Sequence, residues 1–321
     1  MRTFNALSTV TLSLSLALSG CSSDASSPAT AASTGGASST GGKTGTGGMM
    51  SDAAAPDAGL KDIVDTAVAA GSFTKLAGAL TTADLVGTLK GAGPFTVFAP
   101  TDAAFSSFET ANPGVLAGLS KAALTNILTY HVVSGAAVKS GSLKNGQVFV
   151  TVSGSPILVD TSSGVKIGGS TVSTPDVFAS NGVIHVIDKI IMPPANDIVA
   201  TAVAAGTFTT LAGALTTAGL VPTLQGAGPF TVFAPTDAAF AKLASVPTGN
   251  ALKDVLTYHV VSGAVGSGDL SAGMVPTLLS GKSVTVNLTG GVKINSSSVT
   301  TANIIAKNGV IHVIDTVLIP Q

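Results

Sequence analysis

Apolar residues follow a helical period soon after residue 60. Within 72–82 they lie at positions i, i+3, i+4 and i+7, which predicts an amphipathic helix. Ser72 begins this stretch and can cap its first turn with a hydroxyl group. The neighbouring segment 60–70 and a short segment around 83–90 are also expected to be helical. The apolar positions that define the period are Phe73, Leu76, Ala77 and Leu80.

The pattern then changes to that of a strand. Residues 95–99 form a short, nearly all-apolar run of strand-forming side chains, which predicts a buried strand. Pro100 ends this run. Thr101 or Asp102 can then cap a helix that is expected to start at Ala103.

A further helix is expected after Ser120, its N-cap, and it runs into Tyr130 and His131 before a short strand. The segment 146–191 consists of strand-like runs separated by Gly, Ser and Asn turns. Helices that come first and strands that follow favour an α+β architecture over a parallel sheet wound with helices.

The whole pattern occurs twice. Residues 62–85 return at 197–220, and residues 91–105 return unchanged at 226–240. A period this long indicates a duplicated domain and not a solenoid repeat. We therefore expect two domains, repeat 1 at 59–192 and repeat 2 at 197–321, joined by a short Pro-rich linker at 193–196.

The first residues indicate export. One basic residue, Arg2, precedes an apolar run that ends in Leu-Ser-Gly-Cys, which predicts a signal peptide over 1–20. Cys21 is the only cysteine of the chain, and its context resembles the lipobox of bacterial lipoproteins, so we expect it to carry a lipid that binds the membrane. The alternative is a secreted protein with a free thiol.

Residues 21–58 are rich in Gly, Ser, Thr and Ala and lack aromatic and branched aliphatic side chains. Such a segment buries too little surface to offset its ordering entropy, so we expect a disordered tether. Ser22 follows the cysteine, which favours the outer membrane or cell surface of a bacterial envelope over the inner membrane.

Charge argues against nucleic acid as a partner. The formal net charge is −1, and Arg2 is the only arginine. The mature chain would therefore lack the side chain best suited to bidentate phosphate contacts, and its lysines are balanced by acidic residues.

Three short signatures occur in the same order in both repeats. They are Thr-Val-Phe-Ala-Pro-Thr-Asp-Ala-Ala-Phe, Tyr-His-Val-Val and Asn-Gly-Val-Ile-His-Val-Ile-Asp. Together they resemble the fasciclin-like domain family across about 260 residues. The resemblance implies α+β domains in which a wedge of two β-sheets packs against several helices. It also implies secreted or surface-anchored proteins that act in cell adhesion and matrix contact.

The signatures carry the polar side chains that could form a site. We expect these residues to be structural or to take part in binding. Members of the family that bind known ligands often use loops or basic patches outside the signatures. Those regions lack arginine here, so the resemblance does not identify the protein or polysaccharide ligand. The candidates are Thr101, Asp102, Tyr130, His131 and His185 in repeat 1, and Thr236, Asp237, Tyr258, His259 and His312 in repeat 2.

A hydrolase triad of Ser134, His131 and Asp102, mirrored in repeat 2 by Ser262, His259 and Asp237, is the strongest enzyme hypothesis. No Gly-x-Ser-x-Gly elbow occurs in the chain. We instead expect His131 to end a helix, where the helix dipole favours a cation, and to bond Asp102 or the Thr101 backbone. Tyr130 is expected to bury its ring and make one hydroxyl bond.

Two other chemical hypotheses are weaker. His185 and Asp188, repeated as His312 and Asp315, lie three apart on a predicted strand and therefore face opposite sides, which disfavours a metal site. His185 is expected to be half-buried. The Gly91-Ala-Gly93 segment follows a helix and precedes a strand, which is the reverse of a phosphate loop.

These observations favour a surface-anchored, non-catalytic binding protein that needs no cofactor and acts in cell or matrix adhesion. An envelope glycan or small-ligand binding module is the alternative, and a hydrolase comes third.

Overall fold

The computed structural model describes residues 59–321. The predicted signal peptide, Cys21 and the whole of the predicted tether lie outside the described residues. Within 59–321, no helix combines the length and the apolar character that crossing a membrane requires.

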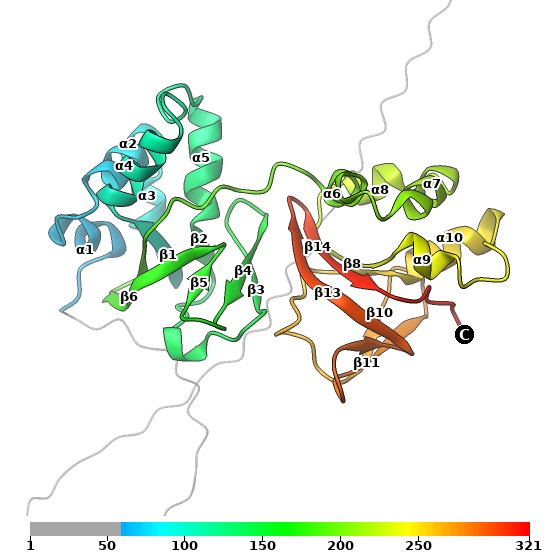
Figure 1. The fold of residues 1–321 in the computed structure, drawn as a ribbon. Coiled ribbons are helices and arrows are strands. Elements are labelled where there is room, and N and C mark those ends of the chain that lie inside the picture. Colours follow the sequence, from blue (N-terminus) through cyan, green and yellow to red (C-terminus); the bar gives the residue numbers. More distant parts are fainter. Residues whose placement is uncertain (1–58) are drawn as a thin grey trace, which may run out of the picture. The chain divides into compact units, whose positions relative to one another are not determined.

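In repeat 1 all five helices precede β2, with only strand β1 between α3 and α4, and the remaining strands follow (Figure 1). A 3₁₀ turn at Ser140–Ser142 precedes β3. The elements are α1 (Ile63–Ala69), α2 (Thr74–Thr82), α3 (Val86–Leu89), β1 (Phe95–Pro100), α4 (Asp102–Ala111), α5 (Lys121–Tyr130), β2 (Val132–Ser134), β3 (Val148–Val150), β4 (Pro156–Asp160), β5 (Lys166–Ile167), β6 (Ser170–Ala179) and β7 (Gly182–Ile187).

Repeat 2 follows the same plan. Its fourth helix, α9, is shorter than α4 because the chain has a deletion after Phe240. The elements are α6 (Ile198–Ala205), α7 (Thr209–Thr217), α8 (Val221–Gln225), β8 (Phe230–Pro235), α9 (Asp237–Phe240), α10 (Gly249–Tyr258), β9 (Val260–Ser262), β10 (Gly273–Pro276), β11 (Ser283–Asn287), β12 (Lys293–Ile294), β13 (Ser297–Ala306) and β14 (Gly309–Ile314).

Each repeat contains a seven-stranded sheet. The strand order is β2-β1-β7-β6-β5-β4-β3 in repeat 1 and β9-β8-β14-β13-β12-β11-β10 in repeat 2. All pairs are antiparallel except β1 with β7 and β8 with β14, which join the first signature to the last one in parallel. The fold class is therefore α+β, as the sequence predicted.

Strand β1 separates two cores because its side chains alternate between its faces. Val97 and Ala99 pack with α1, α2 and α5, whereas Phe98 packs with β4, β5 and Tyr130. The sheet thus bends around a second core on the side away from the helices. Repeat 2 divides its core in the same way around Val232 and Phe233.

Candidate functional site

Thr101 and Asp102 cap two different helices. The Thr101 hydroxyl accepts a hydrogen bond from the Ala104 N–H at 3.2 Å, so it caps α4. The Asp102 carboxylate accepts from the N–H groups of Thr74 and Lys75, at 3.1 and 2.8 Å, and caps α2 from 27–28 residues away. The prediction that Ser72 caps this helix is wrong.

The same pair of caps is present in repeat 2. Thr236 accepts from the Ala239 N–H at 3.2 Å. Asp237 accepts from the N–H groups of Thr209 and Thr210 at 3.2 and 2.7 Å. The Thr210 bond is the largest influence that lowers the pKa of the Asp237 carboxyl below its usual value. This carboxylate is therefore used to hold α7 in place.

His131 lies in the core of repeat 1 with 3% of its surface exposed. Its Nδ1–H donates to the Ile127 carbonyl at 2.8 Å, and its Nε2 accepts from the Ile191 N–H at 3.0 Å. Because both nitrogens have backbone partners of fixed polarity, the ring is the neutral Nδ1–H tautomer. Burial lowers its pKa to about 4.

Two predictions about His131 are therefore wrong. Its partners are backbone groups and not Asp102 or Thr101. It is also not a cation at a helix end, because desolvation outweighs the helix dipole at a fully enclosed site. The ring joins the end of α5 to the segment after β7, and both bonds fix its orientation.

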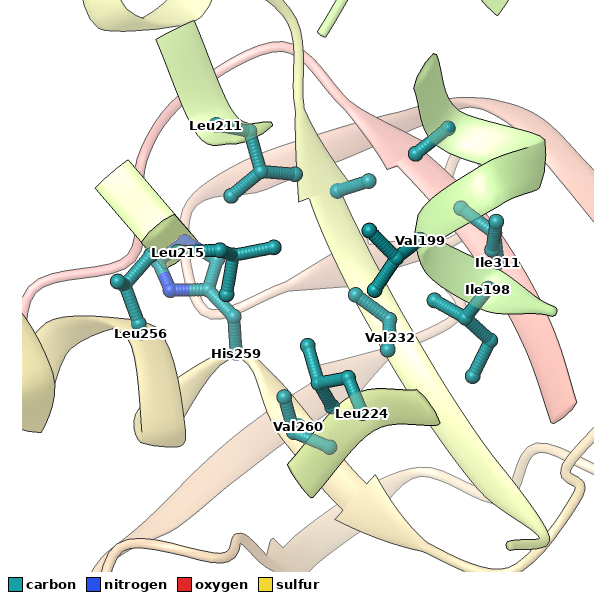
Figure 2. A pocket seen from close by; sticks show the side chains of 12 residues that line it. Ile198, Val199, Leu211, Leu215, Leu224, Val232, Leu256, His259, Val260 and Ile311 are labelled. Carbon is teal, nitrogen blue, oxygen red and sulfur yellow. The ribbon is translucent and has the colours of Figure 1, made fainter. Parts of the chain in front are cut away.

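His259 repeats this arrangement with Val255 and Leu318, at 2.7 and 2.9 Å, and burial lowers its pKa to about 4 as well. Figure 2 shows its ring among aliphatic side chains from several elements of repeat 2. The adjoining cavity is about 20 Å³. A space of this size holds about one water molecule and needs polar partners to do so. This is a packing gap and not a ligand site.

Tyr130 and Tyr258 bury their rings, and each donates its hydroxyl to a backbone carbonyl. The acceptors are Pro156 at 2.9 Å and Ser283 at 2.8 Å. The ring burial and single donated bond predicted for Tyr130 are confirmed, and the bond ties α5 to β4.

His185 is fully buried and not half-buried as predicted. Its Nε2–H donates to the Val138 carbonyl at 2.8 Å, and its Nδ1 accepts from the Asp176 N–H at 3.3 Å. The ring stacks on Phe98 at 5.9 Å between centroids. His312 makes the matching contacts with Val265, Asn303 and Phe233, and burial lowers its pKa.

Asp188 does not join His185. Its carboxylate accepts from the Ser170 hydroxyl and the Thr171 N–H, both at 2.8 Å. Asp315 makes the equivalent bonds with Ser297 and Ser298. In the part of the chain that the structure describes, no three His, Cys, Asp or Glu side chains gather as a metal site.

The hypothetical hydrolase triad does not assemble. The ring nitrogens of His131 are occupied by backbone groups, and the oxygens of Asp102 bind the start of α2. Ser134 lies exposed on β2, opposite Phe95. Ser134, His131 and Asp102 are therefore not hydrogen-bonded to one another as a catalytic triad requires.

Asn181 is a structural residue that sequence reasoning did not single out. Its side-chain carbonyl accepts from the Ile63 N–H at 3.0 Å, and its amide donates to the carbonyls of Leu89 and Gly91 at 2.8 and 2.9 Å. Asn308 makes the same three bonds in repeat 2. The sequence did contain one indication of this role, because the Asn-Gly pair of the third signature is identical in the two repeats.

The glycine after this asparagine is required by close approach. A Cβ on Gly182 would lie 2.1 Å from the Phe95 carbonyl oxygen, and one on Gly309 would lie 2.1 Å from that of Phe230. Gly91 and Gly93 lie in the turn between α3 and β1, as predicted, and this turn packs against Asn181.

The geometry defines a duplicated α+β module whose shared polar residues are bonded internally. The fasciclin domain model matches residues 71–193 and 206–320, so the chain belongs to the fasciclin domain family.

Known proteins resemble one repeat or both. The uncharacterised protein sll1735 of Synechocystis is 42% identical over 135 residues, which are 41% of this chain and 98% of that protein. Pig transforming growth factor-beta-induced protein ig-h3 is 31% identical over 244 residues, which are 73% of this chain. The match spans only 36% of the pig protein's length.

A solved fasciclin domain pair, from the insect cell adhesion molecule Fasciclin I, covers 78% of this chain and 97% of its own. It is 19% identical in sequence, with a TM-score of 0.35.

Proposed function

We propose that this protein is a non-catalytic adhesion protein of a bacterial cell envelope, held at an outer surface by a lipid on Cys21. Family membership supports this proposal, together with the adhesive and matrix-contact roles that the fasciclin resemblance implies. The observation that carries it is the internal use of the polar side chains that the two repeats share. Recognition by these repeats then falls to exposed residues.

Some apolar residues are exposed at the same position in both repeats, where burial does not explain them. Val68 on α1 and Val203 on α6 are the most exposed pair, at 57% and 58%. In the second pair the residues lie just after β3 and β10, and in the third they lie after the last strand of each repeat. The three pairs are Val68 with Val203, Val152 with Leu278, and Met192 with Ile319.

We expect the helix pair to contribute to attachment because Val68 and Val203 offer the same apolar contact twice. Two copies of a weak site on one chain raise overall avidity without new contacts. The test compares cells that display the full chain with cells that display the Val68→Glu and Val203→Glu double variant, on surfaces coated with envelope polymer or matrix protein.

The matched control places Glu at Thr82 and Thr217, which are exposed at the ends of α2 and α7. We expect the valine variant to lose attachment and the threonine variant to keep it, with both at wild-type surface levels. Failure of the wild-type chain to attach to any coated surface would refute the adhesion proposal. Equal attachment by the wild type, the valine variant and the threonine variant would show that Val68 and Val203 do not make the contact.

The alternative function, an envelope glycan or small-ligand binding module, is favoured by one further feature, a surface pocket in repeat 1.

A further inference from the structure

A surface pocket of about 330 Å³ lies in repeat 1, where α1 and the turn into α2 meet strands β6 and β7. Its size falls within the range of small-molecule sites in proteins. The buried histidines are not among its lining residues, whereas Thr101, which caps α4, is. Its lining comes from five segments, namely α1, the turn into α2, Thr101 after β1, and strands β6 and β7, so the fold positions it before any ligand arrives.

Hydroxyl groups surround this pocket. They belong to Thr66, Ser72, Thr101, Ser173 and Thr174. Thr101 accepts the Ala104 N–H, which leaves its own hydrogen free to donate. Ser173 donates to the Val186 carbonyl, which leaves its lone pairs free to accept. Thr174 is exposed, and its hydroxyl makes no hydrogen bond within the described residues. Donors and acceptors are thus both available.

The remaining lining is apolar and carries no charge. Phe73, Val177 and Ile184 belong to this apolar lining, and Phe73 and Ile184 are largely buried. Three carboxylates adjoin lining residues along the chain, and each has partners of its own. Asp65 pairs with Lys90, Asp102 accepts the N–H groups at the start of α2, and Asp176 accepts the N–H of Ser140. A charged ligand would therefore lose its hydration without gaining an ion pair.

We infer that this pocket binds one residue of a neutral saccharide. A sugar ring presents hydroxyl edges and an apolar C–H face, which match the two parts of the lining. A fatty acyl chain fits less well, because it would cover the Thr174 hydroxyl, which has no partner within the described residues, and offer it none. The inference deepens the glycan-binding alternative and does not require adhesion to be correct.

Repeat 2 provides a natural comparison. Eight of the eleven lining residues are identical at the equivalent positions, and the other three are larger in repeat 2. Thr207 replaces Ser72, Thr300 replaces Ser173, and Ile304 replaces Val177, as the matching strand registers show. Each change adds one carbon atom to the lining, so we assign the site to repeat 1.

The test is calorimetric titration of the Cys21→Ser chain with maltotriose, cellotriose and mannotriose. Trigalacturonate and laurate serve as the charged and apolar comparators. We expect at least one neutral trisaccharide to bind at one site per chain and to bind more tightly than either comparator. If no trisaccharide binds, or if trigalacturonate or laurate binds more tightly, the inference is overturned.

Two variants locate the binding. Ser72→Thr, Ser173→Thr and Val177→Ile together give repeat 1 the side chains of repeat 2, and we expect affinity to fall at least about tenfold, because the three added carbon atoms take up space that the sugar ring needs. Thr174→Val removes the unpaired hydroxyl with little change of shape, and we expect a loss of about fivefold. Undiminished binding by both variants would refute this site.

The control makes the reverse changes in repeat 2, namely Thr207→Ser, Thr300→Ser and Ile304→Val. It should keep wild-type affinity or gain a second site, and loss of binding here would contradict the assignment to repeat 1. All variants should unfold at the wild-type denaturant midpoint. Saccharide binding without cell attachment would refute adhesion and keep the site, whereas attachment without saccharide binding would do the opposite.

Discussion

At the residue scale, the four histidines are the most informative side chains. Each ring bonds backbone groups of two segments, and each is buried. An imidazole with one donating and one accepting nitrogen suits this role because it can join a carbonyl to an N–H group when neutral. The histidines therefore act as internal connections, and burial favours the uncharged form of His131, His259 and His312.

This role predicts a pH dependence of stability. Burial lowers the pKa of His131 and of His259 from 6.5 to about 4. As pH falls below 6.5, the unfolded chain takes up protons on these residues before the folded chain does. The stabilising effect of the neutral rings is therefore complete above pH 6.5 and is lost as pH falls toward 4. Each ring accounts for about 3 kcal/mol over that window.

Urea unfolding, followed by circular dichroism because the chain has no tryptophan, should show the midpoint falling steadily from pH 7 to pH 4.5. Asp188 and Asp315 have pKa values below 3.8, so their main contribution is lost at lower pH. A midpoint that stays constant over this range would mean that the histidines are accessible to water in the folded state.

At the element scale, what the sequence could predict depended on distance along the chain. The cap that Ser120 provides was predictable because its partner, the Ala123 N–H, is three residues away. The cap of α2 was not, since the Asp102 carboxylate comes from beyond β1. For the same reason the pairing of His131 with Ile191, 60 residues away, could not be derived from the sequence.

The remote cap gives a direct comparison. Asp102→Ala should lower the free energy of unfolding by about 1 kcal/mol, because two N–H groups at the start of α2 lose their acceptor. Ser72→Ala should change it by less than about 0.5 kcal/mol, because the Ser72 side chain does not cap the helix. Denaturation of the two variants side by side measures this difference, and the reverse order would restore Ser72 as the cap.

At the scale of the whole molecule, duplication separates what the fold needs from what can vary. The capping, tyrosine and histidine contacts are present in both repeats, whereas the lining of the surface pocket differs at three positions. Functions that distinguish the repeats are therefore expected at the surface and not in the shared signatures.

The proposed anchor is tested on the intact chain. Cys21→Ser removes the only thiol that could be acylated, so we expect the protein to move from the membrane fraction to the soluble fraction. Immunoblots of fractionated cells measure this, with Ser22→Ala as a neighbouring control that should stay with membranes. Retention of the cysteine variant in the membrane fraction would show that another feature holds it there.

The central claim is that the shared polar residues are internal, and NMR titration of the histidine rings tests it most directly. The ring signals of His131 and His259 should keep the pattern of the neutral Nδ1–H tautomer from pH 7.5 to pH 5. Titration of either ring near pH 6.5, as for a histidine in contact with water, would contradict the account.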